Sequence, residues 1–375
     1  MYLAIREMRF AKVRYSLIAI IMLLVAFLVL FVTGLARGLA YDNAASIQNM
    51  GATHFIMEKN SNHRFTRSQL NEEVGGQAGL IAGQENVQPL GVKMTVMMAE
   101  GTTGKLDVTL LGINPEGWLM PKVTEGTAIT SDESGQVVVD RKLKDSGIGL
   151  GAVLVDQTSG LKWTVTGFVS HESFSHSPAV FLNEQDWEQL QLKTAPRPGS
   201  DGAGEGRIYN AFAVKANKHQ VEQLVTAFPD SEIVTKSEAV SAIPGYKEEQ
   251  GSLWMMIIFL FIISSFVLAV FFYVITIQKS SQFGILKAIG TRTAYLARSV
   301  ALQVLLLSTG SLIVSTLLVQ AIEAVLPDGM PFQLQISTLA YTSGAFIAMS
   351  LAGSLLSVWK VTQIDALDAI GRSAA

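Results

Sequence analysis

The side chains best suited to bind a ligand gather where a long apolar stretch of the chain begins. Tyr246 and Glu249 are three residues apart, so a helix would place them on one face, and Met255 and Met256 follow one to two turns later. Phenol, carboxylate and thioether groups are all donors to iron. Each residue also has an ordinary explanation: an aromatic ring at a membrane interface, a solvated acid near a helix end, or methionine packing.

A lone basic residue, Arg37, follows the first apolar stretch of the chain. A long cationic side chain near a membrane interface reaches water at little cost, and a guanidinium binds carboxylates through two parallel hydrogen bonds. Arg37 is therefore either an interfacial anchor or a partner for a carboxylate. Gly34 and Gly38 flank it in a small-xxx-small pattern that lets membrane helices approach closely.

Four long stretches without a charged residue decide the class of the protein. Each has at least 20 residues, and they are Ser16–Leu35, Leu253–Ile277, Ser299–Ile322 and Ile336–Trp359. About 20 helical residues cross the hydrocarbon core of a bilayer, and only helices or closed barrels satisfy their backbone groups there. We therefore expect an integral membrane α-helical protein with four transmembrane helices, at residues 15–39, 251–278, 298–325 and 336–359.

A polar block, residues 40–250, separates the first transmembrane helix from the second and predicts a large α+β domain. Segments rich in Val, Thr and Trp between Gly or Asp residues predict strands, and two polar-apolar segments predict short helices. The predicted strands are Lys105–Leu111, Gln136–Asp140, Ala152–Asp156, Trp163–Val169, Ser177–Leu182, Ala211–Lys215 and Glu232–Thr235, and the helices are Asn183–Leu192 and Lys218–Ala227. We expect two lobes, one at 45–112 plus 208–240 and the other at 113–192, and a mobile loop at 194–207.

The distribution of charge predicts how the chain is oriented. Basic residues dominate before the first helix, between the second and third, and after the fourth, whereas block 40–250 has 26 Asp and Glu against 17 Lys and Arg. Because positive loops stay in the cytoplasm, we expect a multi-pass protein of the plasma membrane with both termini cytoplasmic and block 40–250 extracellular. Residues 1–14 alternate apolar and basic positions and predict an amphipathic helix on the inner surface. Residues 326–335 are then a short outer loop and 360–375 a cytoplasmic tail.

Several kinds of chemistry are not expected from this sequence. It contains no cysteine, no phosphate-binding P-loop and no HExxH metal pair. We therefore expect no catalytic residues, no intrinsic cofactor, no metal site of its own and no nucleic-acid partner. His171 and His176 flank a polar turn, which is either a solvated loop or a peripheral contact to a metal or ligand.

The most distinctive local pattern lies in the predicted cytoplasmic segment 279–297. It predicts a helix that continues from the membrane, a break at Gly284, and an amphipathic turn at Ile285–Ile289 that ends at Gly290. A short stiff projection of this kind can dock into a cleft of a partner. The alternative is a simple basic hairpin between two helices.

The segment Gly284–Gly290 closely resembles the cytoplasmic signature of ABC-transporter permeases of the MacB/FtsX type. The order of one helix, a large external domain and three helices matches that family, and Ile364–Ile370 resembles its terminal motif, with departures at Ala366 and Asp368. Within this superfamily the chain looks most like heme-efflux permeases of the HrtB type. The residues that carry this narrower resemblance are Phe271–Lys279, Leu30–Leu39 and Met1–Arg14.

The resemblance implies a complete pump in which this chain is not the ATPase. Two copies of the permease form a homodimer and pair with two copies of an ABC ATPase subunit, which alone binds ATP. Heme is then the substrate, taken from the outer leaflet of the membrane, and its candidate contacts are Arg37, Tyr246, Glu249, Met255 and Met256. The candidate coupling residues are Gly284, Ile285, Leu286, Lys287, Ile289 and Gly290.

Two other functions remain open from the sequence. One is the MacB-type export or sensing of antimicrobial peptides or lipids. The other is FtsX-type signalling across the membrane to control cell-wall hydrolases. They differ from heme export in what the external domain binds.

Overall fold

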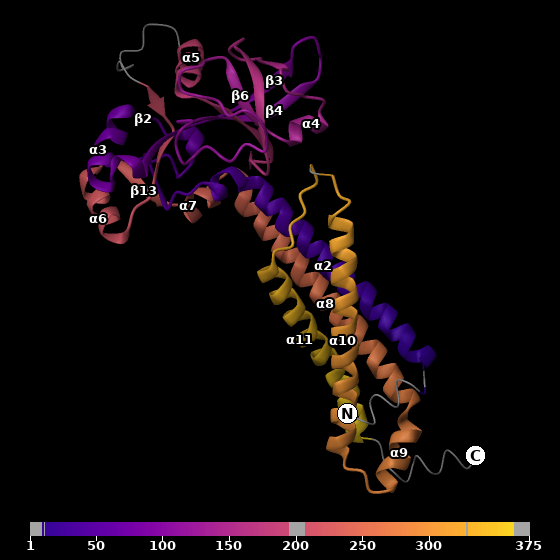
Figure 1. Cartoon of the computed structure of the whole chain (residues 1–375). Coiled ribbons are helices and arrows are strands. Elements are labelled where there is room, and N and C mark those ends of the chain that lie inside the picture. The colour runs from indigo at the N-terminus through magenta and orange to yellow at the C-terminus, as the bar shows by residue number, and fades with distance from the viewer. Residues whose placement is uncertain (1–9, 11, 195–206, 328, 364–375) are drawn as a thin grey trace. The chain divides into compact units, whose positions relative to one another are not determined.

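The computed structural model describes residues 10, 12–194, 207–327 and 329–363, which form two compact units (Figure 1). The helical unit comprises residues up to 38, 251–327 and those from 332 onward. The sheet unit comprises residues 39–250 and 328–331. Three segments with sequence predictions lie largely or wholly outside the described residues: the N-terminal helix at 1–14, the loop at 194–207 and the terminal motif at 364–370.

The predicted transmembrane helices are confirmed in number and order among the described residues. They are α2 (Lys12–Asn49), α8 (Tyr246–Gln278), α10 (Thr293–Glu323) and α11 (Ile336–Gln363), each long and apolar enough to cross a membrane. The predicted transmembrane segment ends at residue 39, next to the end of the helical unit at residue 38, but the helix itself continues to Asn49. The helix continues because Ala44 and Ile47, on one side of its last turns, are fully buried in a core of the sheet unit.

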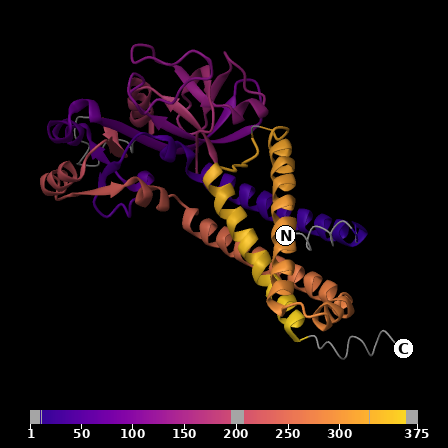
Figure 2. The same cartoon turned by 60° about the horizontal axis from the view of Figure 1, so that its bottom comes forward.

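The four long helices gather into one bundle with a shared apolar core (Figures 1 and 2). Met22 of α2, Phe272 of α8, Val304 of α10 and Phe346 of α11 are all buried in it. Serine hydroxyls help to join α10 to α2, since Ser315 Oγ donates a hydrogen bond to Leu23 O at 2.9 Å. Small polar residues of this kind bring helices close together in lipid.

An eleven-stranded mixed sheet organises the sheet unit, in the order β13-β1-β12-β3-β4-β10-β6-β8-β5, with β7 and β9 paired beside this path. The strands are β1 (His54–Glu58), β3 (Val87–Ala99), β4 (Lys105–Gly112), β5 (Glu125–Gly126), β6 (Gln136–Asp140), β7 (Val153–Asp156), β8 (Lys162–Val169), β9 (Ser173–Phe174), β10 (Ser177–Leu182), β12 (Ala211–Val214) and β13 (Ser231–Thr235). A separate pair consists of β2 (Leu70–Asn71) and β11 (Ile208–Tyr209).

Short helices surround this sheet, and one more connects two membrane helices. They are η1 (Phe65–Arg67), α3 (Glu72–Ala82), η2 (Gln84–Asn86), α4 (Lys142–Asp145), α5 (Glu184–Thr194), α6 (Lys218–Ala227), α7 (Lys236–Ser241) and α9 (Ser280–Ala288). The strands β6 and β10 and the helix α6 have the bounds that the sequence predicts. The capping box of Asn217 and Gln220 fixes the start of α6.

The predicted division into two lobes is not observed. The long strand β3 pairs with β12 at its first residues and with β4 over the rest, and β4 pairs in parallel with β10. The sheet therefore passes from one predicted lobe into the other without a break. The two buried clusters of the sheet unit each contain residues from both predicted lobes, and residues 39–250 belong to one compact unit.

Candidate functional site

Glu249, in the first turn of α8, meets residues from two other segments of the sheet unit. Its Oε2 atom accepts a hydrogen bond from Asn43 Nδ2 of α2 at 2.6 Å and lies 3.0 Å from His176 Nε2. The helix begins here because Pro244 and Gly245 turn the chain, with Gly245 at a φ of 80°. The carboxylate is thus held in one position before any ligand arrives.

His176 lies between two carboxylates. It follows Ser175 in the tight turn between β9 and β10, where both residues have positive φ. Its Nδ1 atom lies 3.4 Å from Asp42 Oδ2, on the side of the ring opposite to Glu249. Asp42 in turn forms an ion pair with Lys142 and accepts a hydrogen bond from Ser173 Oγ at 2.8 Å.

We call Asp42, Asn43, Lys142, His176 and Glu249 the Glu249 cluster. Of these, the sequence singled out Glu249 as a site residue and left His176 as either a solvated loop residue or a ligand contact. The structure favours a defined contact, because the His176 side chain is 40% exposed but bridges two acids. Spacing along the chain gives no signal for this arrangement, since 73 residues separate His176 from Glu249.

A second acidic pair lies deeper, behind the Glu249 cluster. Glu172 is buried, accepts a hydrogen bond from Asn49 Nδ2 at 3.0 Å, and donates its backbone N–H to Asp140 Oδ2 at 2.7 Å. Burial, with a smaller contribution from the nearby Asp140 carboxylate, raises the pKa of Glu172 to about 7. Glu172 therefore keeps its proton at a pH where an exposed glutamate has lost it.

Glu172 should make the stability of the sheet unit depend on pH. Folding raises the pKa of Glu172, so its contribution to the free energy of unfolding is fully present below pH 4.5. That contribution is lost as the pH rises to about 7. Glu172→Gln keeps the acceptor oxygen without the charge, and should raise the free energy of unfolding above pH 7 by up to about 3 kcal/mol. Thermal unfolding of the full chain in detergent, followed by near-UV circular dichroism, measures this. Glu222→Gln, at an exposed position of α6, is the control and should change nothing.

The other predicted contacts divide between the two units. Arg37 is exposed and its guanidinium carbon lies 5.4 Å from the centre of the Trp254 ring, a cation–π contact between α2 and α8 in the helical unit. Met255 and Met256 are 56% and 44% exposed. Each helical residue turns the chain by about 100°, so a residue seven positions later lies within about 20° of the same face. Met256 therefore shares the face of Glu249, whereas Met255 lies about 120° away around the helix.

Tyr246 is half-buried, and its ring packs against a core of the sheet unit. Its backbone N–H donates to Ile243 O at 3.1 Å, at the turn that begins α8. This packing gives the residue a structural role at the helix start. This packing differs from the interfacial ring considered from the sequence, and the contact of Tyr246 with a ligand stays a prediction.

At the other end of α8 the helix direction changes at Lys279, and α9 follows. The predicted break at Gly284 is wrong, because Gly284 lies inside α9 and is buried. Phe283 is buried beside Gly284 and packs with Leu296 and Val300 of α10, which anchors α9 against the bundle. The predicted end at Gly290 is found, at a φ of 97° that suits glycine.

The anchored helix α9, together with the residue that follows it, Ile289, presents an apolar edge. Ile285 and Ile289 are 43% and 78% exposed, while Leu286 packs inward. Lys287 Nζ donates a hydrogen bond to Thr362 O of α11 at 3.1 Å. The predicted coupling residues thus divide into an anchored side and an exposed side.

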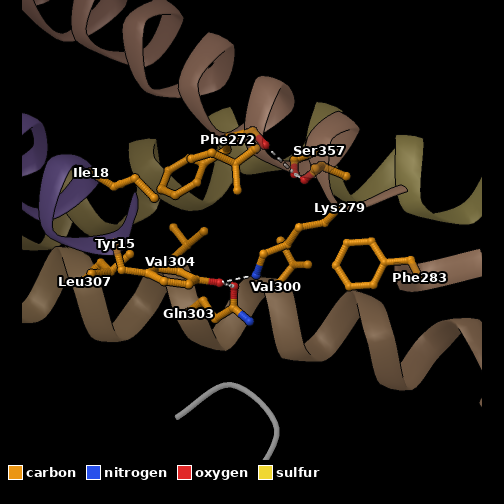
Figure 3. Close-up of a pocket in the computed structure, with 12 residues that line it drawn as sticks. Tyr15, Ile18, Phe272, Lys279, Phe283, Val300, Gln303, Val304, Leu307 and Ser357 are labelled. Atoms are coloured by element: carbon orange, nitrogen blue, oxygen red, sulfur yellow. Dashed lines mark hydrogen bonds between the residues drawn. The ribbon is translucent and has the colours of Figure 1, made fainter. Parts of the chain in front are cut away.

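A polar junction joins all four long helices where α9 begins, and Figure 3 shows the side chains around its small cavity. Lys279, only 5% exposed, donates a hydrogen bond to Tyr15 OH of α2, which donates to Gln303 Oε1 of α10 at 2.7 Å. Nearby, Ser357 Oγ of α11 donates to Phe272 O of α8 at 3.1 Å. A buried lysine within a membrane bundle is costly and therefore indicates a functional or positioning role. The sequence counted Lys279 only as a cytoplasmic charge.

The relatives of the chain agree with this architecture. A model described as the FtsX-like permease C-terminal domain matches residues 254–366. A putative hemin transport system permease protein HrtB of Staphylococcus haemolyticus is 30% identical over 371 residues, which cover 99% of each chain. The chain belongs to the family of FtsX-like ABC-transporter permeases.

Other relatives match this permease over nearly its whole length. The HrtB protein of Staphylococcus epidermidis is 29% identical over 374 residues, and an uncharacterized ABC transporter permease of Mycobacterium tuberculosis is 23% identical over 377 residues. Each match covers 99% of both chains. Among solved structures, the periplasmic region of MacB from Actinobacillus actinomycetemcomitans matches 53% of this permease and 94% of its own chain, with 16% identity and a TM-score of 0.36.

Membership of this family relates the Glu249 cluster and the region around α9 to the parts of an ABC permease. The permease has four membrane helices and a sheet-rich extracellular domain, and as part of an ABC system it works with an ATPase partner. The matched C-terminal domain contains α9 and the polar junction residues Lys279 and Gln303. Glu249 and the other residues of the Glu249 cluster precede the matched range.

Proposed function

We propose that this permease exports heme from the outer leaflet of the plasma membrane and thereby relieves heme toxicity. The observation that carries this proposal is the 30% identity, over 99% of both chains, to a permease named for hemin transport. Heme is a flat apolar ring with a central iron and two carboxylates. The residues around the start of α8 offer a counterpart to each of these parts.

The chemistry of the donor set supports the proposal. Glu249 presents a carboxylate oxygen, which is acceptable to iron, and Met255 and Met256 present exposed thioethers. The guanidinium of Arg37 lies near the Trp254 ring, and its N–H groups can still donate two parallel hydrogen bonds to a heme propionate. The exposed apolar side chains of α8, such as Phe259 and Ile263, suit a lipid-soluble ring or a second copy of the permease.

At the cytoplasmic end, we assign the coupling role to α9. Its exposed residues Ile285 and Ile289 would enter a cleft on the ATPase subunit, with Gly284, Leu286, Lys287 and Gly290 holding the helix in shape. In the full pump two permeases would pair with two ATPase subunits. The excess of basic residues in these segments supports a cytoplasmic position for both termini and α9.

Two continuous helices link the coupling region to the heme site. Both α2 and α8 run from the helical unit into the sheet unit. They are joined to each other by Tyr15 and Lys279 near one end and by Asn43 and Glu249 near the other. A displacement of α9 on ATP binding would therefore reach Glu249 through helix α8 itself, which opens or closes the site.

Hemin binding by the purified permease tests the proposed substrate. Added hemin should give a Soret band whose position reports ligation by the protein, and Glu249→Ala should weaken hemin binding by roughly tenfold or more. Glu248→Ala is the matched control, because Glu248 is the adjacent exposed acid on α8 and makes no contact with His176. An unshifted spectrum with wild-type protein, or equal effects of the two variants, would count against heme.

A further inference from the structure

A broad cleft of the sheet unit lies on a different side of α8 from Glu249. It is lined by the η1 turn and its preceding loop, by α7, and by the first turn of α8. Lys247 lines it, and a two-residue step along a helix is a rotation of about 200°, so Lys247 and Glu249 face nearly opposite ways. The cleft is therefore separate from the Glu249 cluster.

Two arginines of this cleft are held by a rigid turn. Phe65, between Arg64 and Arg67, is buried and packs edge-on against Phe55 with the ring centres 5.2 Å apart. Asn210 Nδ2 donates hydrogen bonds to Phe65 O at 2.8 Å and to Ser68 O at 3.0 Å. The backbone that carries both guanidiniums is thus fixed on each side.

The loop before this turn has an unusual backbone. Asn60, Asn62 and His63 have positive φ values of 67°, 55° and 58°. Positive φ is uncommon outside glycine, and asparagine and histidine are among the residues that adopt it most readily. Here the loop directs the chain so that Arg64 enters the wall of the cleft.

The cleft is lined by more basic than acidic side chains. Arg64, Arg67 and Lys247 are exposed and form no ion pair or side-chain hydrogen bond with any residue that the structure describes. The nearby acids are partly engaged: Glu238 accepts hydrogen bonds from Thr235 in the capping box of α7, and Glu232 pairs with His63 at 3.2 Å. Glu248 is the remaining acid among the lining residues.

The position of Lys247 indicates where the ligand comes from. It lies six residues before Leu253, where the apolar run of α8 begins, which is about 9 Å along a helix. That distance corresponds to the headgroup layer of a bilayer. Arginines suit phosphate groups because their fork donates two parallel hydrogen bonds.

We propose that this cleft binds the phosphate of an anionic phospholipid headgroup through Arg64, Arg67 and Lys247. The hydroxyls of Ser237 and Ser241, which also line the cleft, provide further donors. A bound lipid would fix the start of α8 against the η1 turn. This role is independent of the exported substrate.

Lipid binding to the full chain in detergent tests the proposal. Native mass spectrometry should show that phosphatidylglycerol is retained in preference to phosphatidylcholine, and that the double variant R64Q/R67Q binds phosphatidylglycerol roughly tenfold more weakly. The single variant K247Q should show a smaller loss. The double variant K105Q/K122Q removes the same charge at exposed positions outside the cleft and should bind as the wild type does.

Three outcomes would overturn the proposal. They are equal retention of the two lipids, an equal loss in R64Q/R67Q and K105Q/K122Q, and Arg-dependent binding of inorganic phosphate without binding of phosphatidylglycerol. The last would assign the cleft to a soluble phosphate instead of a lipid. Unchanged near-UV circular dichroism of R64Q/R67Q confirms that a loss of binding is not a loss of fold.

Discussion

A permease that carries Ile285→Glu and Ile289→Glu should reach the membrane in normal amount and lose nearly all ATP-driven export. The two side chains form the exposed apolar edge of α9, and a charged group forced into an apolar cleft is strongly unfavourable without a partner. Central contacts of this kind often dominate an interface, so we expect association with the ATPase to weaken roughly a hundredfold.

The measurement is co-purification of the ATPase with the permease, followed by hemin-stimulated ATP hydrolysis in proteoliposomes. Ile285→Leu with Ile289→Leu keeps the apolar edge and should retain most of both signals. The fold should be unaffected in each variant, because Phe283 and Leu286 still anchor the helix to α10. Normal ATPase association by the glutamate variant would exclude α9 as the docking element.

Lys279→Met should reduce export by about tenfold or more even though Lys279 lies outside the exposed edge of α9. The ammonium group joins the start of α9 to Tyr15 of α2 and, through that hydroxyl, to Gln303 of α10. A buried polar group that loses its partner costs about 1–3 kcal/mol, so the junction should loosen. Motion of α9 would then no longer be passed to the other helices together.

Distances between spin labels distinguish a loosened junction from a general loss of fold. The chain contains no cysteine, so Leu17→Cys on α2 and Gln282→Cys on α9 can be labelled without removing native residues. Lys279→Met should broaden the distance distribution of this pair, and Lys279→Arg should keep it narrower and retain more export. An unchanged distribution together with normal export would show that the junction has no role in transmission.

The sequence predicts the membrane part of the fold well because lipid imposes a simple rule. A stretch of about 20 uncharged apolar residues must become a helix to satisfy its backbone, and the four stretches do so in the described structure. The strands β6 and β10 are predicted to the residue for a similar reason. Their apolar β-branched and aromatic residues are bounded by residues that stop a strand.

Elements that depend on distant partners were not predicted. The segment Glu72–Ala82 contains three glycines and was not predicted as a helix, yet it forms α3. It does so because Gly75 lets the ring of Phe212 approach its backbone, where a Cβ atom would lie 2.3 Å from a ring carbon. The long strand β3 was missed in the same way, since its pairing with β12 and β4 involves residues far apart in the chain.

The candidate sites show the same division. The sequence by itself determined the four membrane helices, the large domain between the first two, the acid at the start of α8 and the apolar segment that becomes α9, because composition and helical period are local properties. Only the tertiary structure decided that His176 stands between Asp42 and Glu249, that Lys279 joins Tyr15 rather than facing water, and that Arg64 and Lys247 share a cleft. Those contacts join residues far apart along the chain, and they form only when sheet pairing and helix packing bring the segments together.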